Sequence, residues 1–138
     1  MKSKRKTLFS AAVLCMALLL SQGCKKNNDD DSASSAYPKT VNIQYKVSSP
    51  AGFTQAMQIQ YTNETGGINS ATNITLPYST SFNKTVNRYD VQVLMFAATG
   101  VGELKGEILV DGAVVASKTF TGSSASSTIP GQVTYTFP

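Results

Sequence analysis

The sequence predicts an all-β protein: an immunoglobulin-like β-sandwich of seven or eight antiparallel strands, with a small open β-barrel as the alternative. From Thr40 onward, apolar and polar residues alternate with a period of two, as in strands with one buried and one solvated face. Turn residues interrupt this alternation at short intervals, and no segment after residue 24 has a convincing helical pattern. Tryptophan is absent and no cysteine pair is available, so the usual hallmarks of true immunoglobulin domains are missing.

The first half of the domain contains four expected strands. The first two are separated by a Ser/Pro/Gly turn at residues 48–52, and the next turn is the cluster 63–67. The third strand stops at Pro77, because proline has no amide hydrogen for the sheet ladder. The four strands are expected at residues 41–47, 57–61, 69–76 and 78–86.

The second half contains four more. Residues 89–97 begin with alternation and end in a continuous apolar run, which predicts a central strand covered on both faces. Residues 99–102 then turn the chain. Asp111 and Gly112 separate strands 104–110 and 113–120, and this pair favours a type I′ hairpin because both positions tolerate positive φ. A Gly/Ser-rich linker at 121–132 leads to a last strand that restores the alternation.

Residues 1–23 have the order of a secretory signal peptide. A cationic patch of Lys2, Lys4, Arg5 and Lys6 precedes an apolar stretch from Leu8 to Leu20. That stretch would be about 20 Å long as a helix, whereas a hydrocarbon core is roughly 30 Å thick. A permanent transmembrane anchor is therefore the weaker interpretation.

Gly23 and Cys24 follow the apolar stretch after Ser21 and Gln22, and they resemble the lipobox of bacterial lipoproteins. The resemblance implies that the Cys24 thiol receives diacylglycerol, and that cleavage before Cys24 frees its amine for a further acyl chain such as palmitate. Two or three acyl chains are sufficient for stable anchoring. We therefore expect a membrane partner through a lipid anchor at Cys24.

Residues 24–38 are expected to form a disordered acidic tether, because their hydrophobicity is low and their charges are clustered. Cys24, two lysines and the run Asp29–Asp31 resemble the start of many Bacteroidetes lipoproteins. This resemblance implies a place at the outer membrane, with display on the cell surface favoured over the periplasmic face. The tripeptide around Ser32 is similar to the O-glycosylation pattern of that phylum, which makes Ser32 a candidate modification site.

Residues 39–138 form the expected domain, and several of its segments together resemble the MmpS family. The most specific segments are Leu76-Pro77-Tyr78 and the hairpin sequence 108–114. The resemblance implies an exported β-sandwich that acts as an accessory to lipid and siderophore exporters of the RND class. Gly106 stands where many members carry a cysteine that pairs with a second one, near Ser126 or Ser127 here, so that disulfide cannot form. The anchor also differs, since it is a lipid here and a transmembrane helix in the family.

The charge balance excludes a basic surface for nucleic acid. Four of the twelve cationic residues lie in the signal peptide, and the remaining eight balance the eight acidic residues. Histidine is absent, which removes the commonest general base and metal ligand. We expect no cofactor, no metal site and no catalytic residue. Glu103 and Glu107 are about 13 Å apart along one strand and are expected on a solvated face, and Asp111 is assigned to turn geometry.

The remaining candidates for binding are aromatic residues near expected loops or strand ends, although packing is the simpler explanation and no ligand-binding residue is nominated. They are Tyr37, Phe53, Tyr78, Phe82 and Tyr89. The expected function is a non-enzymatic accessory or binding module of the cell envelope, with an envelope protein, lipid or glycan as partner. The alternative is a structural or adhesive surface lipoprotein.

Overall fold

The computed structural model describes residues 37–138, and this part of the chain is an all-β domain with about 80% of its residues in strands. The prediction of an all-β antiparallel fold is confirmed. The strands are β1 (Lys39–Ala51), β2 (Gln55–Thr62), β3 (Ile68–Thr75), β4 (Tyr78–Val86), β5 (Val91–Val110) and β6 (Ala113–Thr136).

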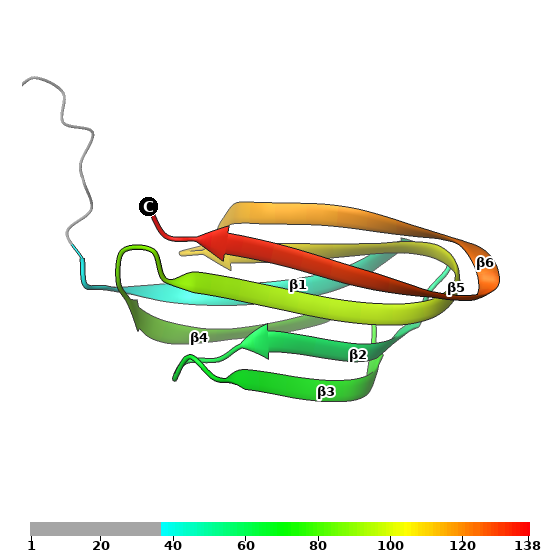
Figure 1. Cartoon of the computed structure of the whole chain (residues 1–138), viewed down its shortest axis with the longest axis horizontal. Coiled ribbons are helices and arrows are strands. Elements are labelled where there is room, and N and C mark those ends of the chain that lie inside the picture. The colour runs from blue at the N-terminus through cyan, green and yellow to red at the C-terminus, as the bar shows by residue number, and fades with distance from the viewer. Residues whose placement is uncertain (1–36) are drawn as a thin grey trace, which may run out of the picture. The chain divides into compact units, whose positions relative to one another are not determined.

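All six strands belong to one antiparallel sheet, which curls into a half-barrel and so corresponds to the open-barrel alternative. The order is β3-β2-β5-β1-β4, and β6 pairs with β5 along nearly its whole length. The first part of β5 pairs with β2 and its last part pairs with β1. The long β5–β6 ribbon therefore belongs to both sides of the half-barrel (Figure 1).

The sequence predicts eight strands, and the structure has six because two expected interruptions lie inside continuous strands. Residues 99–102 reverse the course of β5, as expected, but its pairing with β6 continues through them (Figure 1). Gly100 and Gly102 have φ of 134° and 154°, a region open mainly to glycine, and a Cβ at Gly102 would meet the Phe53 ring. The expected linker 121–132 is likewise the bend of β6, not a loop.

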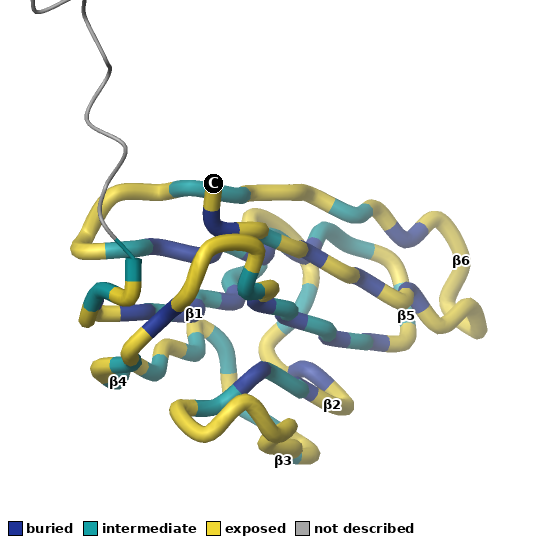
Figure 2. The backbone as a smooth tube through the Cα atoms, turned by 60° about the vertical axis from the view of Figure 1, so that its left-hand side comes forward, coloured by how far each residue is buried: buried dark blue, intermediate teal, exposed yellow. Residues whose placement is uncertain are grey.

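The core lies on the concave side of the sheet. Buried residues alternate with more exposed ones along β1 and β5 (Figure 2). The expectation that residues 89–97 are covered on both faces is wrong, because no second layer formed by residues 37–138 covers the outer face. Val93, Met95 and Ala97 are only half-buried there, whereas Leu94 and Phe96 point into the core.

The expected turns at 63–67, at Pro77 and at 111–112 are confirmed, whereas the expected turn at 48–52 is wrong in large part because residues 48–51 belong to β1. The 63–67 turn is closed by a hydrogen bond from Asn63 N to Gly67 O, and β3 ends before Pro77. Asp111 and Gly112 have φ of 50° and 82° and connect β5 to β6 in two residues, as a type I′ turn requires. The Asp111 carboxylate also accepts a hydrogen bond from Asn42 N at 2.8 Å, which fixes this hairpin to β1.

Tyr37, which precedes the first strand, already packs against the domain. The Tyr37 ring makes an edge contact with Phe137, with ring centroids 6.4 Å apart. Within residues 37–138 there is no helix with the length and apolar character needed to cross a membrane.

Candidate functional site

The two modification sites expected from the sequence, Cys24 and Ser32, lie outside the described residues. Of the acidic residues of the domain, Glu64 and Asp90 line one pocket, whereas the others lie apart from it. Asp111 belongs to the hairpin turn, and Glu107 pairs with Lys105 across 2.7 Å on the outer face of β5. Among residues 37–138, no group of three or more metal-ligating side chains lies close enough together to hold an ion.

Four of the five candidate aromatic residues pack against the core. Tyr37, Phe53, Tyr78 and Phe82 are half-buried against the apolar cluster. Tyr89 is the exception, since 71% of its surface is exposed and Arg88 lies over its ring. Packing therefore explains most of this set.

Tyr78 and Phe82 belong to a larger aromatic cluster with Tyr45 and Tyr61. Tyr61 lies 5.2 Å from Tyr45 and stacks on Phe82 at 6.5 Å, measured between ring centroids. Burial raises the pKa of Tyr78 to about 12, whereas the hydrogen bond from Asn69 lowers the pKa of Tyr61. The cluster can therefore stack through its rings and donate hydrogen bonds through its hydroxyl groups.

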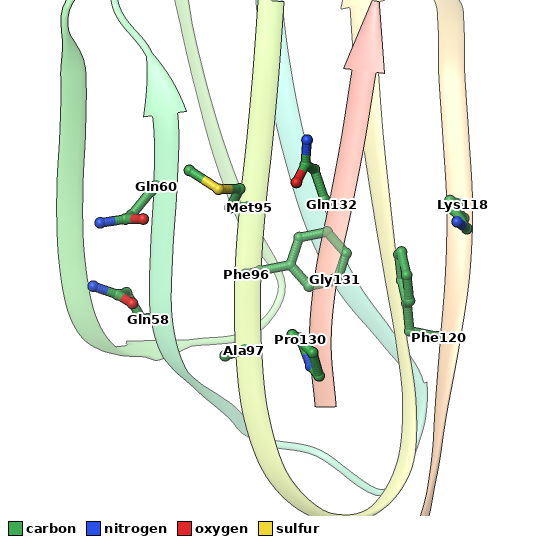
Figure 3. Close-up of a pocket in the computed structure, with 10 residues that line it drawn as sticks. All are labelled: Gln58, Gln60, Met95, Phe96, Ala97, Lys118, Phe120, Pro130, Gly131 and Gln132. Atoms are coloured by element: carbon green, nitrogen blue, oxygen red, sulfur yellow. The ribbon is translucent and has the colours of Figure 1, made fainter. Parts of the chain in front are cut away.

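A groove of about 380 Å³ lies where β6 forms the open edge of the half-barrel (Figure 3). Its walls come from β2, β5 and both arms of β6, which are far apart in the sequence. The lining residues are Gln58, Gln60, Met95, Phe96, Ala97, Lys118, Phe120, Pro130, Gly131 and Gln132.

The groove combines an apolar floor with an amide rim. Phe96 and Phe120 meet edge to face with centroids 5.5 Å apart, and because Phe96 is buried, the half-buried Phe120 is the ring that a ligand can reach. Gln58 and Gln60 both reach toward Ser70 with long hydrogen bonds of 3.4 Å, so their amides are weakly held. Such a surface can bind extended or ring-shaped ligands through stacking and amide hydrogen bonds.

Lys118 supplies the groove's positive charge. Its Nζ lies 5.0 Å from the centroid of Phe120, and the described part of the chain places no carboxylate within ion-pair distance of it. The ammonium is therefore available to a ligand carboxylate, phosphate or hydroxyl.

A second, more polar pocket of about 410 Å³ lies between the 63–67 turn, the end of β4 and the start of β5. Lys84 crosses it and donates a hydrogen bond to Asn63 O at 3.0 Å. Gln92, which is fully buried, lies at its floor. The lining residues are Thr62, Glu64, Thr65, Gly66, Lys84, Thr85, Asn87, Asp90, Val91 and Gln92.

Sequence reasoning missed both sites. The alternation of apolar and polar residues predicts that Gln58 and Gln60 lie on one solvated face of a strand. Only the pairing of β2 with β5, and of β5 with β6, brings Gln132 and Lys118 to the same groove. Gln92 gave a weak signal, because it is a polar residue on the same face of the strand as Leu94 and Phe96, which point into the core.

Neither a family model nor a curated protein matches this chain. The likeness to the MmpS family and to Bacteroidetes lipoproteins therefore stays a prediction from the quoted motifs.

Proposed function

We propose that this chain is a lipid-anchored, non-enzymatic binding module of the cell envelope. The observation that carries the proposal is the groove at the open edge of β6, which offers aromatic rings and amides but no carboxylate, hydroxyl or thiol side chain among its lining residues. The Gly23-Cys24 motif supplies the anchor.

The chemistry of the groove favours binding over catalysis. Its lining side chains include three glutamine amides, two phenylalanine rings and the Lys118 ammonium, and none of them is a carboxylate, hydroxyl or thiol. Of the side chains that commonly perform acid–base or nucleophilic catalysis, only the Lys118 amine lines the groove, and histidine is missing from the sequence.

The acidic run after Cys24 supports a place at the outer membrane, with the domain on the cell surface. An envelope protein, lipid or glycan is then the expected partner. The motifs shared with the MmpS family support assistance to an envelope transporter as one form of this role, although the lipid anchor departs from that family.

Site-specific photocrosslinking in intact cells tests the proposal. A photoreactive amino acid replaces Gln60 in the groove, and the matched control replaces Asn83, an exposed residue on β4 that does not line the groove. We expect irradiation to capture an envelope component from position 60 and much less from position 83. Equal capture from both positions, or none above an unirradiated sample, would contradict a binding role for the groove.

A further inference from the structure

The polar pocket at the end of the half-barrel contains a buried side chain whose hydrogen bonds are incomplete. Tyr45 Oη lies 3.0 Å from both Thr62 O and Gln92 Oε1. A hydroxyl has a single hydrogen, so it donates to one of these oxygens and not to both. Gln92 Nε2 has no partner among the described residues, although the residue is fully buried.

Exchanging the positions of the Gln92 amide oxygen and nitrogen still leaves one hydrogen bond missing. In that orientation Nε2 donates to Tyr45 Oη, the Tyr45 hydroxyl donates to Thr62 O, and the Gln92 carbonyl oxygen is left without a partner. Either way, one polar atom of Gln92 is unpartnered in a buried place, which is costly for a protein unless something else completes the bond. A hydroxyl group fits both cases, because it can donate and accept.

The rest of the pocket has the mixed polarity of a site for hydroxyl groups. The Lys84 ammonium uses one hydrogen on Asn63 O, which leaves two for a ligand. Asp90 uses one carboxylate oxygen to accept a hydrogen bond from Asn87 N, and Glu64 makes no hydrogen bond or ion pair within residues 37–138. Two carboxylates against one ammonium disfavour an anionic ligand, whereas the mixture of donors and acceptors suits a neutral one.

We propose that this pocket binds a neutral saccharide unit, with a sugar hydroxyl completing the hydrogen bonds of Gln92 and others bridging Lys84, Glu64 and Asp90. The volume of about 410 Å³ lies in the range of small-molecule sites. The assignment rests on the proposed binding role and deepens it, since it names a glycan as the ligand class. It is independent of the groove at β6, which shares no lining residue with this pocket.

Titration followed by NMR tests the proposal. The full chain is purified from membranes in lauryldimethylamine oxide, a detergent without a sugar head group, and titrated with glucose, galactose, mannose and N-acetylglucosamine into the millimolar range. At least one sugar is expected to give a saturable shift of the Gln92 side-chain amide and of residues 62–66. If none of the four does so, the pocket holds no saccharide and the proposal is overturned.

Two variants and a control locate the site. Gln92→Leu keeps a similar volume and is expected to weaken binding about tenfold, the effect of losing one well-formed hydrogen bond in a buried site. Glu64→Gln lies on the exposed rim and is expected to weaken binding severalfold without affecting the fold. The matched control Gln44→Leu lies on β1, lines neither this pocket nor the groove, and should bind as the wild type does. Undiminished affinity in both pocket variants would overturn the site, whereas failure of the crosslinking at position 60 would leave this result untouched.

Discussion

Phe96 occupies space that two glycines leave free. A Cβ at Gly106 would overlap Phe96 Cε1, and a Cβ at Gly131 would overlap Phe96 Cε2. The ring is 97% buried between them and also forms part of the floor of the groove. These glycines are therefore required for packing, not for backbone conformation, since neither has a positive φ.

Gly106→Ala should destabilise the domain by about 1–3 kcal/mol, because overpacking forces Phe96 out of its rotamer or moves the backbone. Urea unfolding measures the change. The double variant Gly106→Ala with Phe96→Leu should recover part of the loss, since the smaller side chain makes room for the added methyl group. A single variant as stable as the wild type would show that the Phe96 ring is not confined as described.

The ionisation of Tyr45 makes the free energy of unfolding depend on pH in the alkaline range. Burial raises its pKa well above the ordinary value of 10.0, and the neighbouring Tyr61 also raises it, while the hydrogen bond with Thr62 acts in the opposite direction. In the unfolded chain Tyr45 ionises near pH 10, whereas in the folded domain it stays protonated. The stabilisation that comes from the protonated Tyr45 is therefore fully present below pH 10, and it decreases as the pH rises above that value.

Tyr45→Phe should cost about 1–3 kcal/mol at neutral pH, because Gln92 and Thr62 O then both lose the hydroxyl. Above pH 10 the variant should lose less stability per pH unit than the wild type, since one source of the loss is gone. Tyr78 has a raised pKa in both proteins and accounts for part of the remaining slope. Denaturant unfolding measured from pH 7 to 11 provides the comparison, and parallel curves would refute this role of Tyr45.

At the level of the elements, β6 presents the longest free edge of the sheet. Val93 N donates to Thr62 Oγ1, so the odd-numbered residues in this part of β5 direct their amide groups toward β2. Ala97 follows the same parity and pairs with Pro130, whose nitrogen therefore faces away from β5, toward the free edge. Proline at that position removes a donor from the edge and hinders pairing with another chain.

Pro130→Val should promote association through the edge of β6, because it restores an amide hydrogen and raises the strand propensity. The matched control is Thr134→Val, which adds a similar apolar side chain at an exposed position of the same strand without adding an amide hydrogen. Light scattering after size exclusion should give a higher mass for Pro130→Val as concentration increases, and an unchanged mass for Thr134→Val. Equal behaviour of the two variants would contradict a protective role for Pro130.

At the scale of the whole molecule, alternation and turn chemistry predicted the strand segments because both are local. Asp111-Gly112 and Pro77 mark their turns through backbone requirements of their own. The continuity of β5 and β6 could not be predicted, since Gly100 and the residues around Ser124 look like loop residues until the pairing partner across the bend is known. The prediction that Met95 is covered by a second layer was wrong for a related reason, because an apolar run in the sequence does not show whether both faces of a strand are covered.

The candidate sites depend still more on pairing. The pairing of β2 with β5 and of β5 with β6 brings together Gln58, Gln132 and Lys118. The role of Gln92 depends on its contact with Tyr45, which lies 47 positions away along the chain. The predicted anchor is the opposite case, because the motif that predicts it consists of the adjacent residues Gly23 and Cys24. For that reason the anchoring claim can be tested at a single position.

Acyl labelling of Cys24→Ser tests the central claim of lipid anchoring most directly. Cells are fed a clickable palmitate analogue, and the protein is then followed by fractionation. We expect the wild type to be labelled and to sediment with membranes, and the variant to lose both properties, while strands β1 to β6, which begin at Lys39, still fold. Undiminished labelling together with unchanged membrane retention in the variant would contradict the account.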